Sequence, residues 1–172
     1  MNTVLLIGIA VTGAALLISI VATSIPFWWR VAADDWDESI NFGLFQFCRY
    51  TRSDEICMSY ISVSDWLRAT QAMMIMCILS LAASAGLSLL FGFVLTDKTS
   101  IALAAAFVAM AGAFFGLLGV IIYGAKMSDP DDIIHVLSVL NGSLHAGFGL
   151  AAVAVVLAMI APVLVFCSRN SN

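Results

Sequence analysis

Residues 101–124 read IALAAAFVAMAGAFFGLLGVIIYG, a run of twenty-four positions without a charged side chain. A helix of that length rises about 36 Å, enough to cross the hydrocarbon core of a bilayer. Three further runs lack Asp, Glu, Lys and Arg over a similar length, at residues 3–25, 69–95 and 143–167. Barrel strands would instead alternate polar and apolar residues over about ten positions. The four runs therefore predict a membrane all-α four-helix bundle.

The composition supports a membrane protein and excludes two other classes. Of 172 residues, 62% are hydrophobic and 10% are charged, with a net charge of -4. A soluble domain is nearer half apolar and a quarter charged, and a chain this short has too little interior to bury the surplus. Seven Lys and Arg against eleven Asp and Glu cannot form the basic face that nucleic acids require. Membrane lipid is thus the first expected partner.

The first run has an alternative interpretation as a cleaved signal peptide, because residues 21–24 (VATS) offer small side chains near a possible cleavage site. The run lacks a basic segment before it, and its apolar stretch is longer than that of a usual signal peptide. We therefore treat residues 3–25 as a retained helix.

The spans divide residues 1–172 into a single domain with two long loops on one side of the membrane. These loops are residues 26–68 and 125–142, whereas the short loop 96–100 and the tail 168–172 lie on the other side with both termini. Five of the seven Lys and Arg fall on the long-loop side, so the positive-inside rule favours a cytoplasmic position for these loops.

Two cysteines favour the opposite orientation. Cys48 and Cys57 lie in the first long loop with eight residues between them, and an oxidising compartment would let them form a disulfide bond. Asn141 opens an Asn-Gly-Ser glycosylation acceptor, although it lies very close to the fourth run.

The first loop favours strands. Residues 27–31, 41–50 and 55–61 are rich in aromatic and β-branched side chains and are separated by polar turns. A small antiparallel sheet is therefore expected. A bond between Cys48 and Cys57 would join adjacent strands and contribute up to about 3 kcal/mol to the stability of a sheet too small to be stable alone.

The same loop carries a recognisable motif, with PFWWRV at residues 26–31, GLFQFC at 43–48 and a second cysteine at 57. It resembles the signature of the claudin superfamily, in which a Trp precedes Gly-Leu-Trp, two residues, Cys and a second Cys about eight to ten residues later. Trp29, Gly43 and Leu44 match this signature, and Phe45 stands where Trp is usual.

A second segment narrows the resemblance. Residues 67–75, LRATQAMMI, are similar to the corresponding segment of peripheral myelin protein, epithelial membrane proteins and the lens fibre membrane protein. Claudins proper usually carry Arg at the position of Gln71, so the likeness leans toward the myelin and lens branch.

The resemblance implies a claudin-like, left-handed bundle with a small extracellular antiparallel β-sheet of about five strands, four from the first loop and one from the second. It implies a multi-pass protein of the plasma membrane with the long loops outside and both termini cytoplasmic. It also implies a tetraspan that organises cell–cell contacts or membrane assemblies, with itself as partner in cis or in trans. The alternative is an auxiliary subunit that regulates an ion channel or receptor, as the calcium-channel gamma subunits of this superfamily do.

Catalysis finds no support in the sequence. His135 and His145 have no Cys or carboxylate cluster at metal-ligand spacing, and no Ser/His/Asp arrangement is visible. No charged residue lies inside a span, which argues against an ion-coupled transporter. We therefore expect a non-enzymatic protein without metal or cofactor.

Several residues of the spans have expected structural roles. Gly112 and Gly116 form a small-xxx-small pair for close packing, within the bundle or against a partner helix. Gln71, the lone amide in a span, is expected to form a hydrogen bond across the bundle. Cys167, at the end of the fourth run, is either a palmitoylation site or a free thiol.

Aromatic side chains are expected where the first span ends. Trp28 and Trp29 follow Pro26 directly, at the depth where an aromatic ring with one polar N–H suits the membrane interface. Interfacial anchoring and contact with a partner are both open interpretations of this pair.

Overall fold

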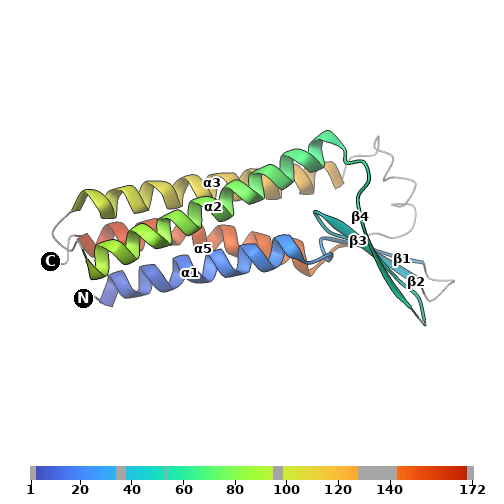
Figure 1. Cartoon of the computed structure of the whole chain (residues 1–172), viewed down its shortest axis with the longest axis horizontal. Helices are drawn as coiled ribbons and strands as arrows, with labels where there is room; N and C mark the ends of the chain where they lie inside the picture. Colours follow the sequence, from blue (N-terminus) through green and yellow to red (C-terminus); the bar gives the residue numbers. More distant parts are fainter. Residues whose placement is uncertain (1–2, 34–37, 53, 95–98, 128–142, 170–172) are drawn as a thin grey trace.

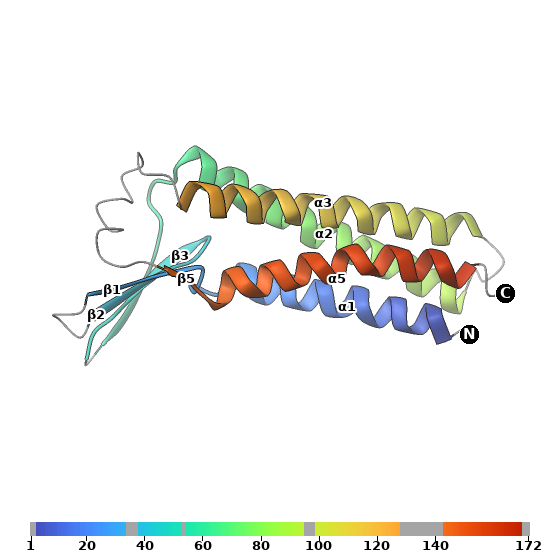
Figure 2. The same ribbon diagram turned by 180° about the vertical axis from the view of Figure 1, so that it is seen from behind.

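Four long helices form the body of the molecule. The computed structural model describes residues 3–33, 38–52, 54–94, 99–127 and 143–169. Four helices in these ranges are long and apolar enough to cross a membrane: α1 (Thr3–Ser24), α2 (Asp65–Phe93), α3 (Thr99–Met127) and α5 (Ala146–Arg169). They run side by side, and the start of α1 and the end of α5 lie at the same end of the bundle (Figure 1, Figure 2).

Small side chains fill the middle of the bundle. The most extensive helix contacts are those of α2 with α3 and of α1 with α5. The buried cluster at mid-height consists of Ala15, Cys77, Leu81, Ala113 and Ala158. Lipid chains supply no hydrophobic drive to association, so close backbone approach and van der Waals packing hold such helices together. A hydrogen bond of 2.8 Å from the Ser84 hydroxyl to the Ala105 carbonyl also joins α2 to α3.

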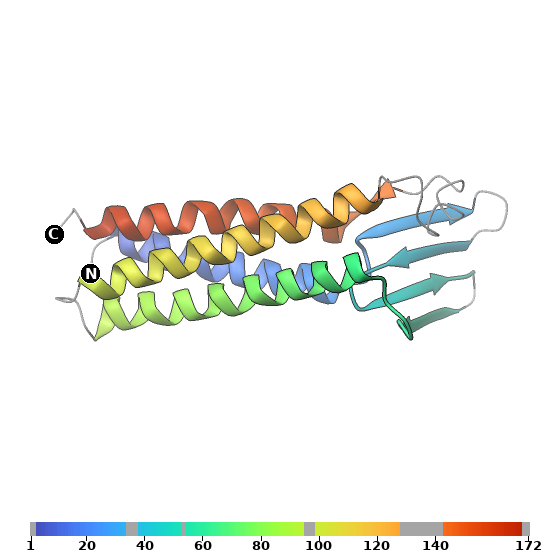
Figure 3. The same cartoon turned by 90° about the horizontal axis from the view of Figure 1, so that it is seen from above.

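A five-stranded antiparallel sheet extends from the other end of the bundle (Figure 3). Its strands are β1 (Trp29–Ala33), β2 (Glu38–Phe42), β3 (Gln46–Tyr50), β4 (Glu55–Ser59) and β5 (Ser143–Leu144). Their order in the sheet is β4-β3-β2-β1-β5. The prediction of a bundle of four apolar helices with a small antiparallel sheet is confirmed.

The second expected strand, residues 41–50, is divided. It contains the end of β2, a turn at residues 43–45 and the whole of β3. The turn is closed by a hydrogen bond of 2.9 Å from the Gly43 N–H to the Gln46 carbonyl. The aromatic residues on both sides of Gly43 therefore concealed a hairpin.

The fourth helix begins later than the sequence indicated. Residues 143–167 were expected to be helical throughout, but Ser143 and Leu144 form β5, which pairs with Arg30 and Trp29 of β1. The strand β5, which the described part of the second half of the chain contributes, thus lies at the start of the fourth run, directly before α5. A hydropathy pattern cannot reveal this pairing, because the partner strand lies more than a hundred residues earlier in the chain.

Two other helices are longer than their charge-free runs. α2 begins at Asp65 instead of residue 69, and α3 continues to Met127 beyond residue 124. Charged residues limit the stretch that lipid can cover, but they do not end a helix.

Glycines in α3 allow the close packing of the bundle, and this leads to a test. A Cβ atom on Gly116 would lie 2.9 Å from the Val155 side chain of α5 and 3.0 Å from Cys77 Sγ of α2. We expect Gly116→Ala to lower the free energy of unfolding by about 1–3 kcal/mol, because overpacking forces neighbours to shift. Thermal unfolding in detergent, followed by circular dichroism, measures this loss.

The matched control is Gly86→Ala in α2, where an added Cβ would meet nothing within 4 Å. This variant should stay within about 1 kcal/mol of the native protein, because alanine is the better helix former. Equal losses in the two variants would contradict the packing role of Gly116.

Candidate functional site

The turn of residues 43–45 docks the sheet onto the bundle. A Cβ atom at Gly43 would lie 2.7 Å from Pro26 Cα and 2.9 Å from the Ile25 carbonyl oxygen. Both neighbours are backbone atoms at the end of α1 and cannot move aside as a flexible side chain could. Glycine is therefore required by the close approach of two backbone segments.

Leu44 is the residue of this turn whose side chain packs into the bundle. Its side chain is fully buried in a cluster at the sheet end of the bundle, whose buried members are Ala22, Trp28, Leu44, Leu67, Met74, Tyr123, Met127 and Ala151. Residues from α1, α2, α3 and α5 meet in this cluster. The hydrophobic contact thus ties one turn of the sheet to all four helices.

Two hydrogen bonds hold the same turn. The Gln71 side-chain amide donates to the Leu44 carbonyl at 2.6 Å, and the Tyr60 hydroxyl donates to the Gly43 carbonyl at 3.0 Å. The expectation that Gln71 bonds across the bundle is therefore wrong, since its partner is the sheet turn. Burial raises the pKa of Tyr60 to about 12, so its hydroxyl remains a donor at neutral pH.

Phe45 points away from this docking contact. Its side chain is 43% exposed, whereas Gly43 and Leu44 beside it are buried. The signature therefore has two parts, a docking pair and an outward aromatic. The replacement of the usual Trp by Phe45 alters the surface and leaves the docking pair unchanged.

Trp28 is the aromatic residue that the junction is built around. Its indole is fully buried, and the Nε1–H donates to the Ala22 carbonyl at 2.6 Å. In a continuing helix that carbonyl would accept from the N–H of residue 26, but Pro26 has no N–H. The indole thus supplies the donor that proline removes.

The backbone of Trp28 joins further elements. Its N–H donates to the Phe42 carbonyl at 2.9 Å, and its carbonyl accepts from the His145 N–H at 3.0 Å. Its ring lies edge-on to Tyr123 and Phe148, with centroid distances of 4.8 and 6.1 Å. Trp28 is a core residue whose ring is fully buried, so it is not exposed to lipid headgroups or to a partner, the two open interpretations of this pair.

Trp29, the residue that matches the signature, is less buried than Trp28 and makes fewer described contacts. It is half-buried in β1 at the margin of the cluster, and its Nε1 has no hydrogen-bond partner among the described residues. Sequence reasoning chose Trp29 by spacing. Pro26 leaves the Ala22 carbonyl without its usual backbone donor, and a search for a nearby side-chain donor would have identified Trp28.

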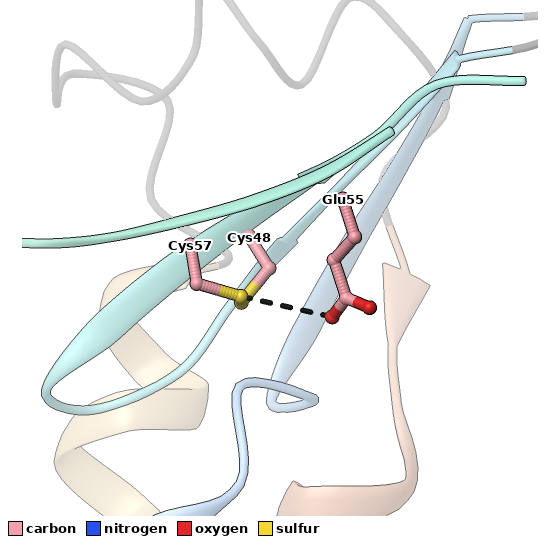
Figure 4. Close-up of a disulfide and its surroundings, with 3 residues drawn as sticks. All are labelled: Cys48, Glu55 and Cys57. Atoms are coloured by element: carbon pink, nitrogen blue, oxygen red, sulfur yellow. Dashed lines mark hydrogen bonds between the residues drawn. A yellow bond between two sulfur atoms is a disulfide. The ribbon is translucent and has the colours of Figure 1, made fainter. Parts of the chain in front are cut away.

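The predicted disulfide bond joins Cys48 of β3 to Cys57 of β4. The two residues face each other directly in the strand register, with a Cα–Cα distance of 4.1 Å. Cys48 is fully buried and Cys57 is exposed. Figure 4 shows the Glu55 carboxylate beside this bond, with Oε1 3.7 Å from Cys57 Sγ. The three residues have the spacing of metal ligands, but both sulfurs are bonded to each other and neither is a thiolate.

The remaining predicted residues are spread along the chain. Gly112 packs against Ser80 and Cys77 of α2, so Gly112 and Gly116 both lie in the interior of the bundle. Cys167 is an exposed free thiol near the end of α5. Asn141 lies outside the described residues.

The whole-chain comparison agrees with this architecture. A model of the family described as PMP-22/EMP/MP20/Claudin matches residues 2–165. The chain belongs to this PMP-22/EMP/MP20/Claudin family. A search of curated proteins finds no match to the sequence. Family membership and the four apolar helices make the chain a multi-pass tetraspan membrane protein.

The two neighbouring tryptophans of this family member give a direct test of the junction. We expect Trp28→Phe to cost about 2–4 kcal/mol of stability, because it leaves the Ala22 carbonyl without a donor and opens a cavity. Trp29→Phe should cost less than about 1 kcal/mol, because its indole N–H has no partner to lose in the described structure. Thermal midpoints in detergent, measured with the disulfide intact, compare the two. A larger loss for Trp29 would overturn the assignment of Trp28.

Proposed function

We propose that this family member is a non-enzymatic tetraspan of the plasma membrane that organises cell–cell contacts through its sheet. In this proposal the sheet faces the extracellular space and both termini are cytoplasmic. The disulfide bond supports that orientation, since such bonds persist in oxidising compartments. The proposed partner is a second copy of the chain, in the same membrane or in the opposite one.

The observation that carries the proposal is a row of exposed apolar side chains on and just after strand β4. Ile56 and Met58 of β4 are about half exposed, and Ile61 beyond β4 is fully exposed. The sheet extends past the end of the bundle, so in this proposal water and not lipid surrounds β4. Apolar side chains gathered on a water-facing surface favour a protein–protein contact.

β4 is also an edge strand among the described residues, because it pairs with β3 on one side and ends the sheet on the other. All five of its residues are exposed. An edge strand presents unpaired backbone groups that a second chain can pair with. The apolar row would give such pairing its affinity, and alternate side chains would give it specificity.

A second candidate function is an auxiliary subunit of a channel or receptor. It is favoured by an apolar groove of about 300 Å³ between α3 and α5, in the half of the bundle away from the sheet. Phe107, Met110, Val163 and Phe166 line this groove, which opens on the side of the bundle. A partner's transmembrane helix would pack there through van der Waals contacts.

A charged residue in the apolar row tests the leading proposal. We expect Met58→Asp to reduce the aggregation of suspended cells roughly tenfold or more, because the contact would bury an unpaired carboxylate. Ser59→Asp is the matched control, since it places the same charge on the next exposed residue of β4, on the opposite face. Aggregation is scored at equal surface expression.

Unchanged aggregation of Met58→Asp cells would contradict the contact. Cross-linking followed by mass spectrometry separates the two functions. A cross-linked product that contains only copies of this chain supports self-association. A channel recovered in a fixed ratio to the chain, with both the native protein and Met58→Asp, supports the auxiliary subunit.

The proposed orientation has its own test. An epitope inserted between α2 and α3 should be detected only after cells are permeabilised, because this connection lies at the cytoplasmic end in the proposal. Antibody binding is compared in intact and permeabilised cells. Labelling of intact cells would reverse the orientation and with it the adhesive role of the sheet.

A further inference from the structure

The two sulfurs of the disulfide bond differ in accessibility. Cys48 is fully buried, whereas Cys57 on the edge strand is exposed. A thiolate reduces a disulfide by attacking one sulfur in line with the S–S bond, so access decides which sulfur reacts. We therefore expect attack from solvent at Cys57 Sγ.

A carboxylate lies beside that sulfur. Glu55 precedes Cys57 by two residues in β4, so both side chains project from the same face of the sheet. The Glu55 Oε1 atom is 3.7 Å from Cys57 Sγ (Figure 4). A disulfide sulfur carries no hydrogen, so this contact is not a hydrogen bond. The sulfur therefore does not offset the negative charge of the neighbouring carboxylate.

A tyrosine on β3 is the cross-strand neighbour of the carboxylate. Tyr50 lies directly opposite Glu55 in the strand register. The pKa of Tyr50 is raised by burial, and further by its hydrogen bond to Glu55 and by the charge of that carboxylate. Glu55 thus lies beside the exposed cysteine of the disulfide bond, with Tyr50 as its cross-strand neighbour.

We propose that the Glu55 carboxylate slows the reduction of the Cys48–Cys57 disulfide bond by thiols. In the first step a thiolate forms a bond with Cys57 Sγ, and the Cys48–Cys57 bond breaks with Cys48 leaving as a thiolate. A second thiolate then attacks the mixed disulfide and releases Cys57. Two thiols lose two electrons and become a disulfide, the two cysteines gain them, and water supplies their protons. The first step brings negative charge to the sulfur that Glu55 adjoins.

The size of the effect follows from Coulomb's law. Two unit charges about 4 Å apart in water repel by about 1 kcal/mol, which corresponds to roughly a fivefold change in rate. Arg30 stands in the same cross-strand row through Asn41 and Cys48, but it is three strands from Cys57, or about 14 Å. That distance exceeds the screening length of about 8 Å at physiological ionic strength. Arg30 therefore does not cancel the charge of Glu55.

The test compares Glu55→Gln with Asp54→Asn, which removes an equal charge one residue earlier in the chain. The full-length protein in non-ionic detergent is treated with three thiols whose attacking forms differ in charge. These are 2-mercaptoethanesulfonate (-2), 2-mercaptoethanol (-1) and cysteamine (net zero). Reduction is stopped by alkylation, and the Cys57 peptide is quantified by mass spectrometry.

We expect Glu55→Gln to be reduced about fivefold faster than the native protein by 2-mercaptoethanol, faster still by 2-mercaptoethanesulfonate, and about equally by cysteamine. These differences should shrink in about 1 M salt, where the screening length is about 3 Å. Asp54→Asn should match the native rates with all three thiols.

Two results would overturn the proposal. Acceleration of Glu55→Gln by the same factor with all three thiols would mean that the substitution loosens the sheet. Unchanged rates would mean that the carboxylate has no effect on the attack. Glu55→Asp, which keeps the charge but shortens the side chain, should fall between the native protein and Glu55→Gln.

Discussion

The hydrogen bond from the Trp28 indole N–H to the Ala22 carbonyl links the first helix to the sheet. Pro26 ends α1 and removes the backbone donor that this carbonyl would otherwise have. An unpaired carbonyl inside a dry cluster costs about 1–3 kcal/mol, so the indole both satisfies the helix end and fixes the direction in which the chain leaves it. β1 then starts at a defined angle, and Gly43 can approach Pro26 closely enough for Leu44 to enter the bundle.

The helices and the sheet are adapted to different surroundings, lipid for the helices and water for the sheet. Lipid surrounds helices whose interior is made of alanine, glycine and serine, where packing and short backbone distances replace the hydrophobic effect. The sheet lies beyond the helix ends and carries a disulfide bond between β3 and the edge strand β4. In the two proposed functions, its outward apolar side chains contact another protein outside the bilayer, and the groove between α3 and α5 binds a partner helix within the bilayer.

The sequence predicted the features that depend on composition and local pattern. Charge-free runs identified the four helices, and the cysteine spacing with its family resemblance identified the disulfide bond. Features that depend on distant contacts were missed or misplaced. Ser143 and Leu144 have no local strand signal and become a strand because β1 offers a free edge. Gln71 has its partner in a turn twenty-seven residues earlier, and spacing alone could not separate Trp28 from Trp29.

The central claim is that a disulfide-bonded sheet docks on the bundle and faces the extracellular space. Labelling of Cys57 on intact cells with a membrane-impermeant maleimide, before and after treatment with an impermeant phosphine, tests both parts of it. The account predicts no labelling before reduction and labelling after it. Labelling without reduction would show that the disulfide bond is absent. If cells treated with a membrane-permeant reductant and then with the same impermeant maleimide are still not labelled at Cys57, the sheet does not face the extracellular space.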